Sequence, residues 1–102
     1  MAKENKNIAK KTIKPGKDLV SSTVEDLKEQ ALSFMDQGVK EITIDFSGIE
    51  DLDSKGLGLL IALNNSLKGI GGKLKIKNIS GKIYKFFQTI HLDKSIEVAS
   101  PG

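Results

Sequence analysis

The clearest alternation of apolar and polar positions lies in KEITIDF, residues 40–46, where apolar side chains occupy every second position. A period of two with β-branched side chains is typical of a strand that buries one face. KLKIKNI, residues 73–79, repeats the pattern with lysines between its apolar side chains, which predicts a strand with one wet face or an exposed edge. Weaker patterns of the same kind predict short strands at residues 8–13 and 95–98.

Three other stretches repeat their apolar side chains every three or four residues, which is the period of a helix with one buried face. Ser22 followed by Glu25 fits a capping box for the first of them, and Ser80 fits the N-cap of the last. Phe86 and Phe87 cannot face the core equally, so we expect one of them to be only partly buried. The predicted helices lie between Ser22 and Gly38, from Gly56 to Lys68, and from Ser80 to Ile90.

Strands and helices therefore alternate along the chain. This order predicts an α/β fold with a mostly parallel sheet of four to five strands, alternating helices and right-handed crossovers. The chain has 102 residues, 38% of them hydrophobic, and shows no interior linker and no repeat. Those features fit one compact domain spanning residues 1–102.

Charge is unevenly distributed along the chain. The first seventeen residues contain six lysines and one glutamate, so they carry +5, and the remainder carries about −2 of the formal net charge of +3. We expect residues 1–14 to form a basic, partly frayed segment that includes the weak first strand. All sixteen cationic residues are lysines, which lack the planar fork that arginine offers to phosphate or guanine. Direct binding to nucleic acid is therefore not expected.

The sequence also bounds the compartment and the cofactors. No apolar run approaches the roughly 20 residues of a membrane span, so none is expected. The N-terminal MAKENKNIAKK lacks the apolar centre of a secretory signal, and the absence of cysteine excludes disulfides and thiolate metal sites. We expect a cytoplasmic protein that uses no metal and no other cofactor.

DLDSKGLGLL, residues 51–60, places Ser54 where a strand is followed by a helix, the end of an α/β sheet that usually carries chemistry. A nucleophile elbow needs glycine two residues before its serine and two residues after it, but Leu52 occupies the first of these positions. The sole histidine, His91, is expected at the far end of the last helix. A serine hydrolase is therefore disfavoured.

Two further interpretations concern the acids and the serine of this stretch. Asp51 and Asp53 have the spacing of a magnesium pair, but no matching lysine or acidic loop follows, so two solvated loop acids are favoured. Ser54 suits a helix N-cap, whose loss costs about 1 kcal/mol. Capping does not explain Gly56 and Gly58 in the first helical turn, where each costs roughly 0.5 to 1 kcal/mol against alanine. We expect a neighbouring strand or a partner protein to approach this helix start closely.

The same helix start suits a phosphate. Its free amides and the positive end of its dipole stabilise an added negative group. Phosphorylation of Ser54 adds a charge of about −1.5 to −2 beside Asp51 and Asp53. A partner that docks on this surface in its neutral form would then be repelled.

The chain resembles the STAS-domain anti-sigma-factor antagonists from about Gly16 to Val98. ITIDFSGIEDLDSKGLGLL is similar to the family's strand followed by an apolar-Asp-Ser-x-Gly-apolar-Gly segment. LKGIGGKLKIKNIS resembles the family's connection from its second helix to the next strand, and IYKFFQTIHLDKSIEV resembles its third helix and last strand. The resemblance implies a single STAS domain that acts as a binding protein without catalytic residues.

The resemblance also implies a switch. Ser54 falls on the family's phosphorylation site, and the unmodified protein is expected to bind an anti-sigma factor with serine kinase activity, which then releases its sigma factor. Phosphorylation breaks this complex, and a metal-dependent serine phosphatase restores the unmodified form. The residues expected to contact the partner are Thr23, Asp51, Asp53, Ser54, Lys55, Gly56 and Gly58.

Other functions fit parts of the sequence. A STAS scaffold or regulator in a non-sigma signalling system, chemotaxis-like or part of a stress complex, or in a transport system fits the same motif. A small hydrolase or phosphatase that uses Asp51, Asp53 and Ser54 lacks a base, and DNA binding by the terminal lysines is disfavoured. We expect a monomer or a weak homodimer.

Overall fold

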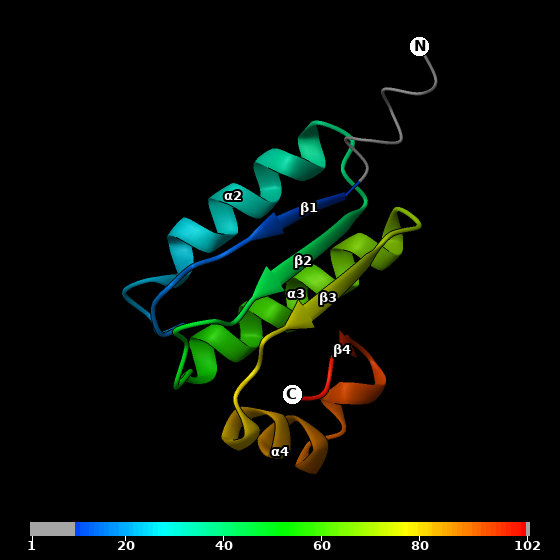
Figure 1. Ribbon diagram of the computed structural model, residues 1–102. Helices are drawn as coiled ribbons and strands as arrows, with labels where there is room; N and C mark the ends of the chain where they lie inside the picture. Colours follow the sequence, from blue (N-terminus) through cyan, green and yellow to red (C-terminus); the bar gives the residue numbers. More distant parts are fainter. Residues whose placement is uncertain (1–9, 102) are drawn as a thin grey trace.

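The computed structural model describes residues 10–101, in which strands alternate with helices along the chain (Figure 1). The elements are β1 (Lys10–Ile13), α2 (Val24–Asp36), β2 (Glu41–Asp45), α3 (Ser54–Gly69), β3 (Lys73–Lys77), α4 (Gly81–Thr89), the 3₁₀ turn η1 (Leu92–Lys94) and β4 (Glu97–Val98). The predicted alternation is confirmed, and η1 is an addition to it. Residues 8 and 9 of the first predicted strand lie outside the described residues.

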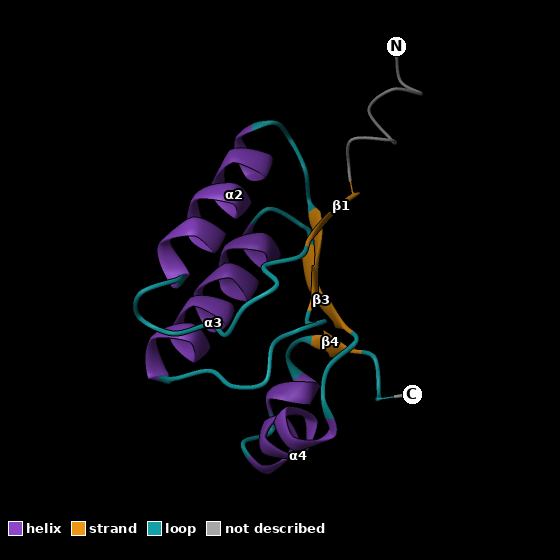
Figure 2. Ribbon diagram, turned by 60° about the vertical axis from the view of Figure 1, so that its left-hand side comes forward, coloured by secondary structure: helices purple, strands orange, loops and turns teal. Residues whose placement is uncertain are grey.

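All four strands are parallel and lie in the sheet in sequence order, β1-β2-β3-β4. Parallel neighbours need crossover connections, which contain α2, α3 and α4 with η1. When successive crossovers have the same handedness and each moves to the next strand in the same direction across the sheet, their helices lie on the same face. Figure 2 shows α2 and α3 on the same side of the sheet. The predicted parallel α/β architecture is therefore confirmed, with four strands.

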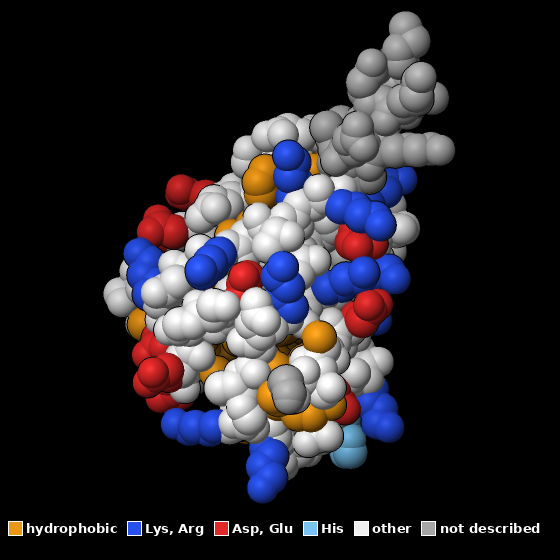
Figure 3. Space-filling view, viewed as in Figure 1, with side chains coloured by type: hydrophobic (Ala, Val, Ile, Leu, Met, Phe, Trp, Pro, Cys, Tyr) orange, Lys and Arg blue, Asp and Glu red, His pale blue; other side chains and the backbone are white. Residues whose placement is uncertain are grey.

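The other face of the sheet carries polar side chains and is the face seen in Figure 3, where lysines and acids are interleaved. Lys75 of β3 places its Nζ 3.0 Å from the Glu41 carboxylate on β2 and 3.6 Å from the Glu97 carboxylate on β4. The hydrogen bond between Lys75 and Glu41 raises the pKa of Lys75 and lowers that of Glu41. β3 is thus an interior strand with one wet face rather than an exposed edge.

The core lies between the sheet and its helices. Phe46, just after β2, and Phe87 of α4 meet edge to face with ring centroids 6.3 Å apart. Phe87 is fully buried, whereas Phe86 is 42% exposed, which confirms the prediction that one phenylalanine of the pair is only partly buried. The strands contribute the fully enclosed side chains of Ile42, Ile44, Leu74 and Ile76.

The predicted start of the first helix is wrong. Val24 is the first residue of α2 and Thr23 is its N-cap, so Ser22 and Glu25 do not form a capping box. The Thr23 hydroxyl makes no cap bond because it binds backward into the preceding loop, where its Oγ1 accepts from the Val20 amide at 3.0 Å. Ser80, by contrast, caps α4 as predicted, since its Oγ accepts from the Ile83 amide at 3.2 Å.

Candidate functional site

Ser54 is the first residue of α3, at the end of the loop that follows β2, and its side chain is exposed. Asp53 is the N-cap of this helix, and its Oδ1 accepts from the Gly56 amide at 3.0 Å. The capping role considered for Ser54 is therefore wrong, because the preceding carboxylate already occupies the position that a capping oxygen needs. The Ser54 hydroxyl makes no hydrogen bond with residues 10–101, and it remains accessible to chemistry from outside.

The Asp53 carboxylate holds a second segment as well. Its Oδ2 accepts from the Ser21 amide at 3.0 Å, which ties the start of α3 to the loop before α2. The hydrogen bond from Gly56, and after it the one from Ser21, hold the pKa of Asp53 below its usual range. Both oxygens of this carboxylate thus accept backbone hydrogen bonds, which does not favour the magnesium pair considered for Asp51 and Asp53.

The loop before α2, residues 18–23, pairs with the loop before α3, residues 46–53. Leu19 donates its amide to the Asp51 carbonyl at 3.2 Å and accepts from the Asp53 amide at 3.1 Å, in the manner of one rung of a parallel sheet. Asp18 adds a side-chain bond, since its Oδ1 accepts from the Glu50 amide at 2.8 Å. We call residues 18–23 and 46–53 the paired loops.

Gly56 lies where these loops meet α3. It is buried, and a Cβ atom at this position would collide with the Leu19 carbonyl oxygen. The close approach that the sequence predicted is found at Gly56, but a loop of the same chain makes it rather than a neighbouring strand or a partner protein. Gly58 is exposed with open space around its Cα, so no residue of the described chain requires glycine there.

Thr23 belongs to the inner part of the paired loops. Its hydroxyl donates to the Asp18 carbonyl at 2.6 Å and accepts from the Val20 amide at 3.0 Å, and the side chain is half-buried. These bonds hold loop 18–23 in the conformation in which the Ser21 amide donates to the Asp53 carboxylate. The structure therefore assigns Thr23 a role inside the loop, whereas the side chains of Asp51 and Lys55 are exposed.

A shallow apolar hollow of about 220 Å³ adjoins this surface. Asp51 and Leu52 of the paired loops form one side of it, and Lys82, Ile83 and Phe86 of α4 form the other. Sequence reasoning expected only that either Phe86 or Phe87 would be partly buried, and it gave neither a role at this surface. The partner of Phe86 across the hollow is more than thirty residues away along the chain, and no local pattern indicates that contact.

The remaining chemical candidates lie apart from this site. His91 is exposed after the end of α4, with a φ of 62° and no place in a triad with Ser54. Within residues 10–101 no group of three histidine, aspartate or glutamate side chains is arranged to hold a metal ion. In the same part of the chain, every helix is too short or too polar to cross a bilayer.

Known proteins resemble this chain in sequence and in fold. A family model described as "Mlab, STAS domain" matches residues 10–98. The anti-sigma-B factor antagonist of Bacillus subtilis (strain 168) is 28% identical over 98 residues, which are 96% of this chain and 87% of that protein.

Two solved structures of the anti-sigma factor antagonist SpoIIAA have the same fold. The unphosphorylated form is 27% identical with a TM-score of 0.64, and the match covers 76% of this chain and 71% of the other. The phosphorylated form of the Bacillus cell-fate determinant SpoIIAA is 26% identical with a TM-score of 0.68, covering 87% of this chain and 81% of the other.

Proposed function

The chain belongs to the STAS-domain family, and we propose that it acts as an anti-sigma factor antagonist that is switched by phosphorylation of Ser54. In the unmodified state it binds an anti-sigma factor with serine kinase activity, which then releases its sigma factor. Phosphorylation of Ser54 by this partner breaks the complex. A serine phosphatase returns the protein to its binding state.

The position of Ser54 carries the proposal. The hydroxyl is exposed at the first residue of a sixteen-residue helix, while the neighbouring Asp53 makes the cap bond that a serine at this position often supplies. The fold therefore does not use the Ser54 side chain, and a phosphate can be attached without breaking an internal hydrogen bond. The positive end of the α3 dipole favours that phosphate.

The charge of the surface explains how modification would switch binding. Asp51 is exposed and Asp53 lies directly before Ser54, so two acidic residues lie within three positions of the serine along the chain. A phosphate adds about −1.5 to −2 to this surface, and a partner that accepts the neutral serine then meets strong like-charge repulsion and a desolvation penalty. The Lys55 ammonium is exposed next to the serine and offsets part of this charge.

The relatives support the choice of partner. One is an antagonist of an anti-sigma factor, and another has been solved both with and without phosphate. His91, the sole histidine of the sequence, lies beyond the end of α4 and makes no hydrogen bond with Ser54, so it gives no support to a hydrolase that pairs Ser54 with a histidine base. A binding module is thus the function that the site supports best.

A capture experiment tests the proposal. Ser54→Ala and Ser54→Glu proteins, immobilised in equal amounts, are exposed to extracts of the native cells, and captured proteins are quantified by mass spectrometry. We expect a kinase that binds the alanine variant at least roughly tenfold better than the glutamate variant, and that phosphorylates the purified wild-type chain at Ser54 with Mg²⁺ and ATP. Ser66→Glu, which changes an exposed serine later in α3, is the matched control and should bind like wild type.

Equal capture by the Ser54→Ala and Ser54→Glu proteins would contradict the charge switch. A partner that binds but never phosphorylates Ser54 would favour the alternative of a constitutive STAS scaffold in another signalling or transport system.

A further inference from the structure

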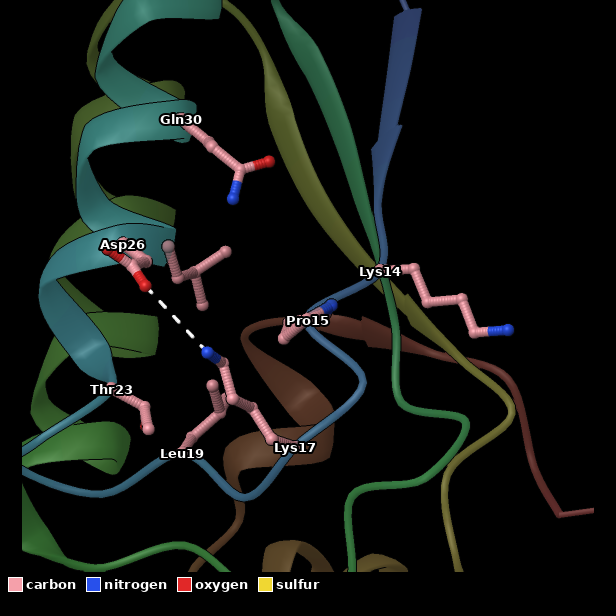
Figure 4. Close-up of a pocket in the computed structure, with 8 residues that line it drawn as sticks. Lys14, Pro15, Lys17, Leu19, Thr23, Asp26 and Gln30 are labelled. Atoms are coloured by element: carbon pink, nitrogen blue, oxygen red, sulfur yellow. Dashed lines mark ion pairs between the residues drawn. The ribbon is translucent and has the colours of Figure 1, made fainter.

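A hollow of about 230 Å³ lies between the β1–α2 connection and the first turns of α2, and it exposes little that a partner could contact. Lys17 is directed across its mouth toward Asp26 (Figure 4), with its Nζ 3.8 Å from Asp26 Oδ2. The leucines that line this hollow, Leu19 and Leu27, are 0% and 2% exposed. They therefore give a ligand no apolar wall.

The hollow of about 220 Å³ between the paired loops and α4 has an accessible apolar wall instead. On the side of α4, Phe86 is 42% exposed, and its ring lies 6.3 Å from that of the buried Phe87, centroid to centroid. Leu52 of the paired loops is half-buried and forms the other side, while Ile83 is buried and adds little. The surface open to contact therefore consists of Phe86, Leu52 and the exposed side chain of Lys82.

The Leu52 side of the hollow is held by the same bonds that position Ser54. The backbone of Leu19 donates to the Asp51 carbonyl at 3.2 Å and accepts from the Asp53 amide at 3.1 Å, so the residues on both sides of Leu52 are fixed. Asp53 in turn caps the helix whose first residue is Ser54. Protein partners of standard size bury about 800 Å² of each surface. A partner seated on Ser54 therefore reaches a hollow whose wall is two residues away along the chain.

We propose that this hollow receives one leucine or methionine side chain of the kinase that binds unmodified Ser54; the inference rests on the proposed function. The volume of the hollow is below the roughly 300 to 1,000 Å³ of small-molecule sites. Binding energy between proteins is concentrated where one anchor side chain fills such a pocket. Lys82 and Asp51 border the hollow with opposite charges, so it selects neither an anion nor a cation, and the anchor is apolar.

The first test measures affinity for the kinase that the Ser54→Ala protein captures, after that kinase has been purified. In the Ser54→Ala chain, Phe86→Ala should weaken binding at least roughly tenfold, because the pocket loses its aromatic wall. Phe86→Leu keeps an apolar wall and should stay within about threefold of the parent. Leu32→Ala is the matched control and should bind like the parent, since Leu32 is 43% exposed on α2 and does not line the hollow.

Photo-crosslinking separates direct contact from an indirect effect on the fold. In the complex with the purified kinase, Phe86→p-benzoylphenylalanine should attach on irradiation to one kinase peptide, at or beside a leucine or methionine. Leu32→p-benzoylphenylalanine should attach to none. Full kinase affinity of the Phe86→Ala chain, or no crosslink from position 86 in a complex that still forms, would overturn the anchor and leave the proposed function intact. A Ser54→Ala chain that captures no kinase would instead remove the proposed function, and this inference with it.

Discussion

Asp53 and Ser21 are joined across the paired loops, since the Ser21 amide donates to Asp53 Oδ2 at 3.0 Å. The other carboxylate oxygen caps α3 through the Gly56 amide at 3.0 Å. One side chain therefore fixes both the start of the helix that carries Ser54 and the neighbouring loop. The surface that presents Ser54 is built from two segments, and Asp53 connects them.

Asp53→Ala should destabilise the fold, while Ser54→Ala should change the free energy of unfolding by less than about 0.5 kcal/mol. The alanine at position 53 removes the acceptor for two backbone amides, whereas Ser54 caps nothing. Urea unfolding of both variants tests this difference: the urea concentration at the unfolding midpoint should fall below the wild-type value for Asp53→Ala but not for Ser54→Ala. A loss for Ser54→Ala as large as that for Asp53→Ala would show that the serine side chain supports the helix start.

Two glycines in the first turns of α3 should respond in opposite directions to alanine. Gly56→Ala drives a Cβ atom into the Leu19 carbonyl, and such overpacking typically costs about 1 to 3 kcal/mol. Gly58→Ala meets open space and should stabilise the helix by roughly 0.5 to 1 kcal/mol. Thermal and urea unfolding give both values. A stabilised Gly56→Ala protein would refute the close packing of the paired loops on α3.

Phe86 and Phe87 offer a matched pair in α4. Phe87 is fully buried against Phe46, so Phe87→Ala should cost about 3 to 5 kcal/mol. Phe86 is 42% exposed, and its replacement by alanine should cost clearly less. Chemical denaturation of the two variants under identical conditions makes the comparison, and similar losses would mean that Phe86 is not at the surface in solution.

Asp45 should set part of the acid sensitivity of the fold. Its Oδ1 accepts from Asn78 Nδ2 at 3.0 Å and from the Ser47 amide at 2.9 Å. These bonds, with the one from Asn78 first, lower the pKa of Asp45 from 3.8 to about 2. Because the folded state has the lower pKa, this stabilisation is fully present above pH 3.8 and is lost as the pH falls through about 2.

Asn78→Gly isolates the side-chain contribution, since Asn78 has a φ of 58° that glycine adopts without strain. We expect the pKa of Asp45 to rise toward 3.8 in this variant, as followed by the carboxyl ¹³C shift during an acid titration. An unchanged pKa would assign the shift to the bonds from Ser47 and the charge of Lys77 instead.

The arrangement of the sheet was predictable because each element carries its own pattern. Alternation in KEITIDF and helical spacing around Phe87 report burial directly, and strict alternation of strands with helices leaves a parallel sheet as the natural topology. The motif around Ser54 was also recognisable, since its acids and glycines are adjacent in sequence.

The paired loops were not predictable from local pattern. Ser21 and Asp53 are distant in sequence. The donor is the backbone amide of Ser21, which nearly every residue type has, so the residue type at this position does not predict the bond. The same holds for Thr23, which takes the N-cap position predicted for Ser22 and whose hydroxyl bonds to Asp18 and Val20 instead of to the first turn of α2. Assigning the cap of α3 to Asp53 rather than Ser54 needed the geometry of both candidates at the same helix start.

The most direct measurement of the central claim is quantitative phosphopeptide mass spectrometry of the protein isolated from its own cells, growing and stressed. The account predicts phosphate on Ser54 whose occupancy changes between the two conditions, with Ser66 and Ser47 unmodified. Ser54 without phosphate in either condition, in a protein shown to be fully recovered, would contradict the switch and leave a constitutive binding domain.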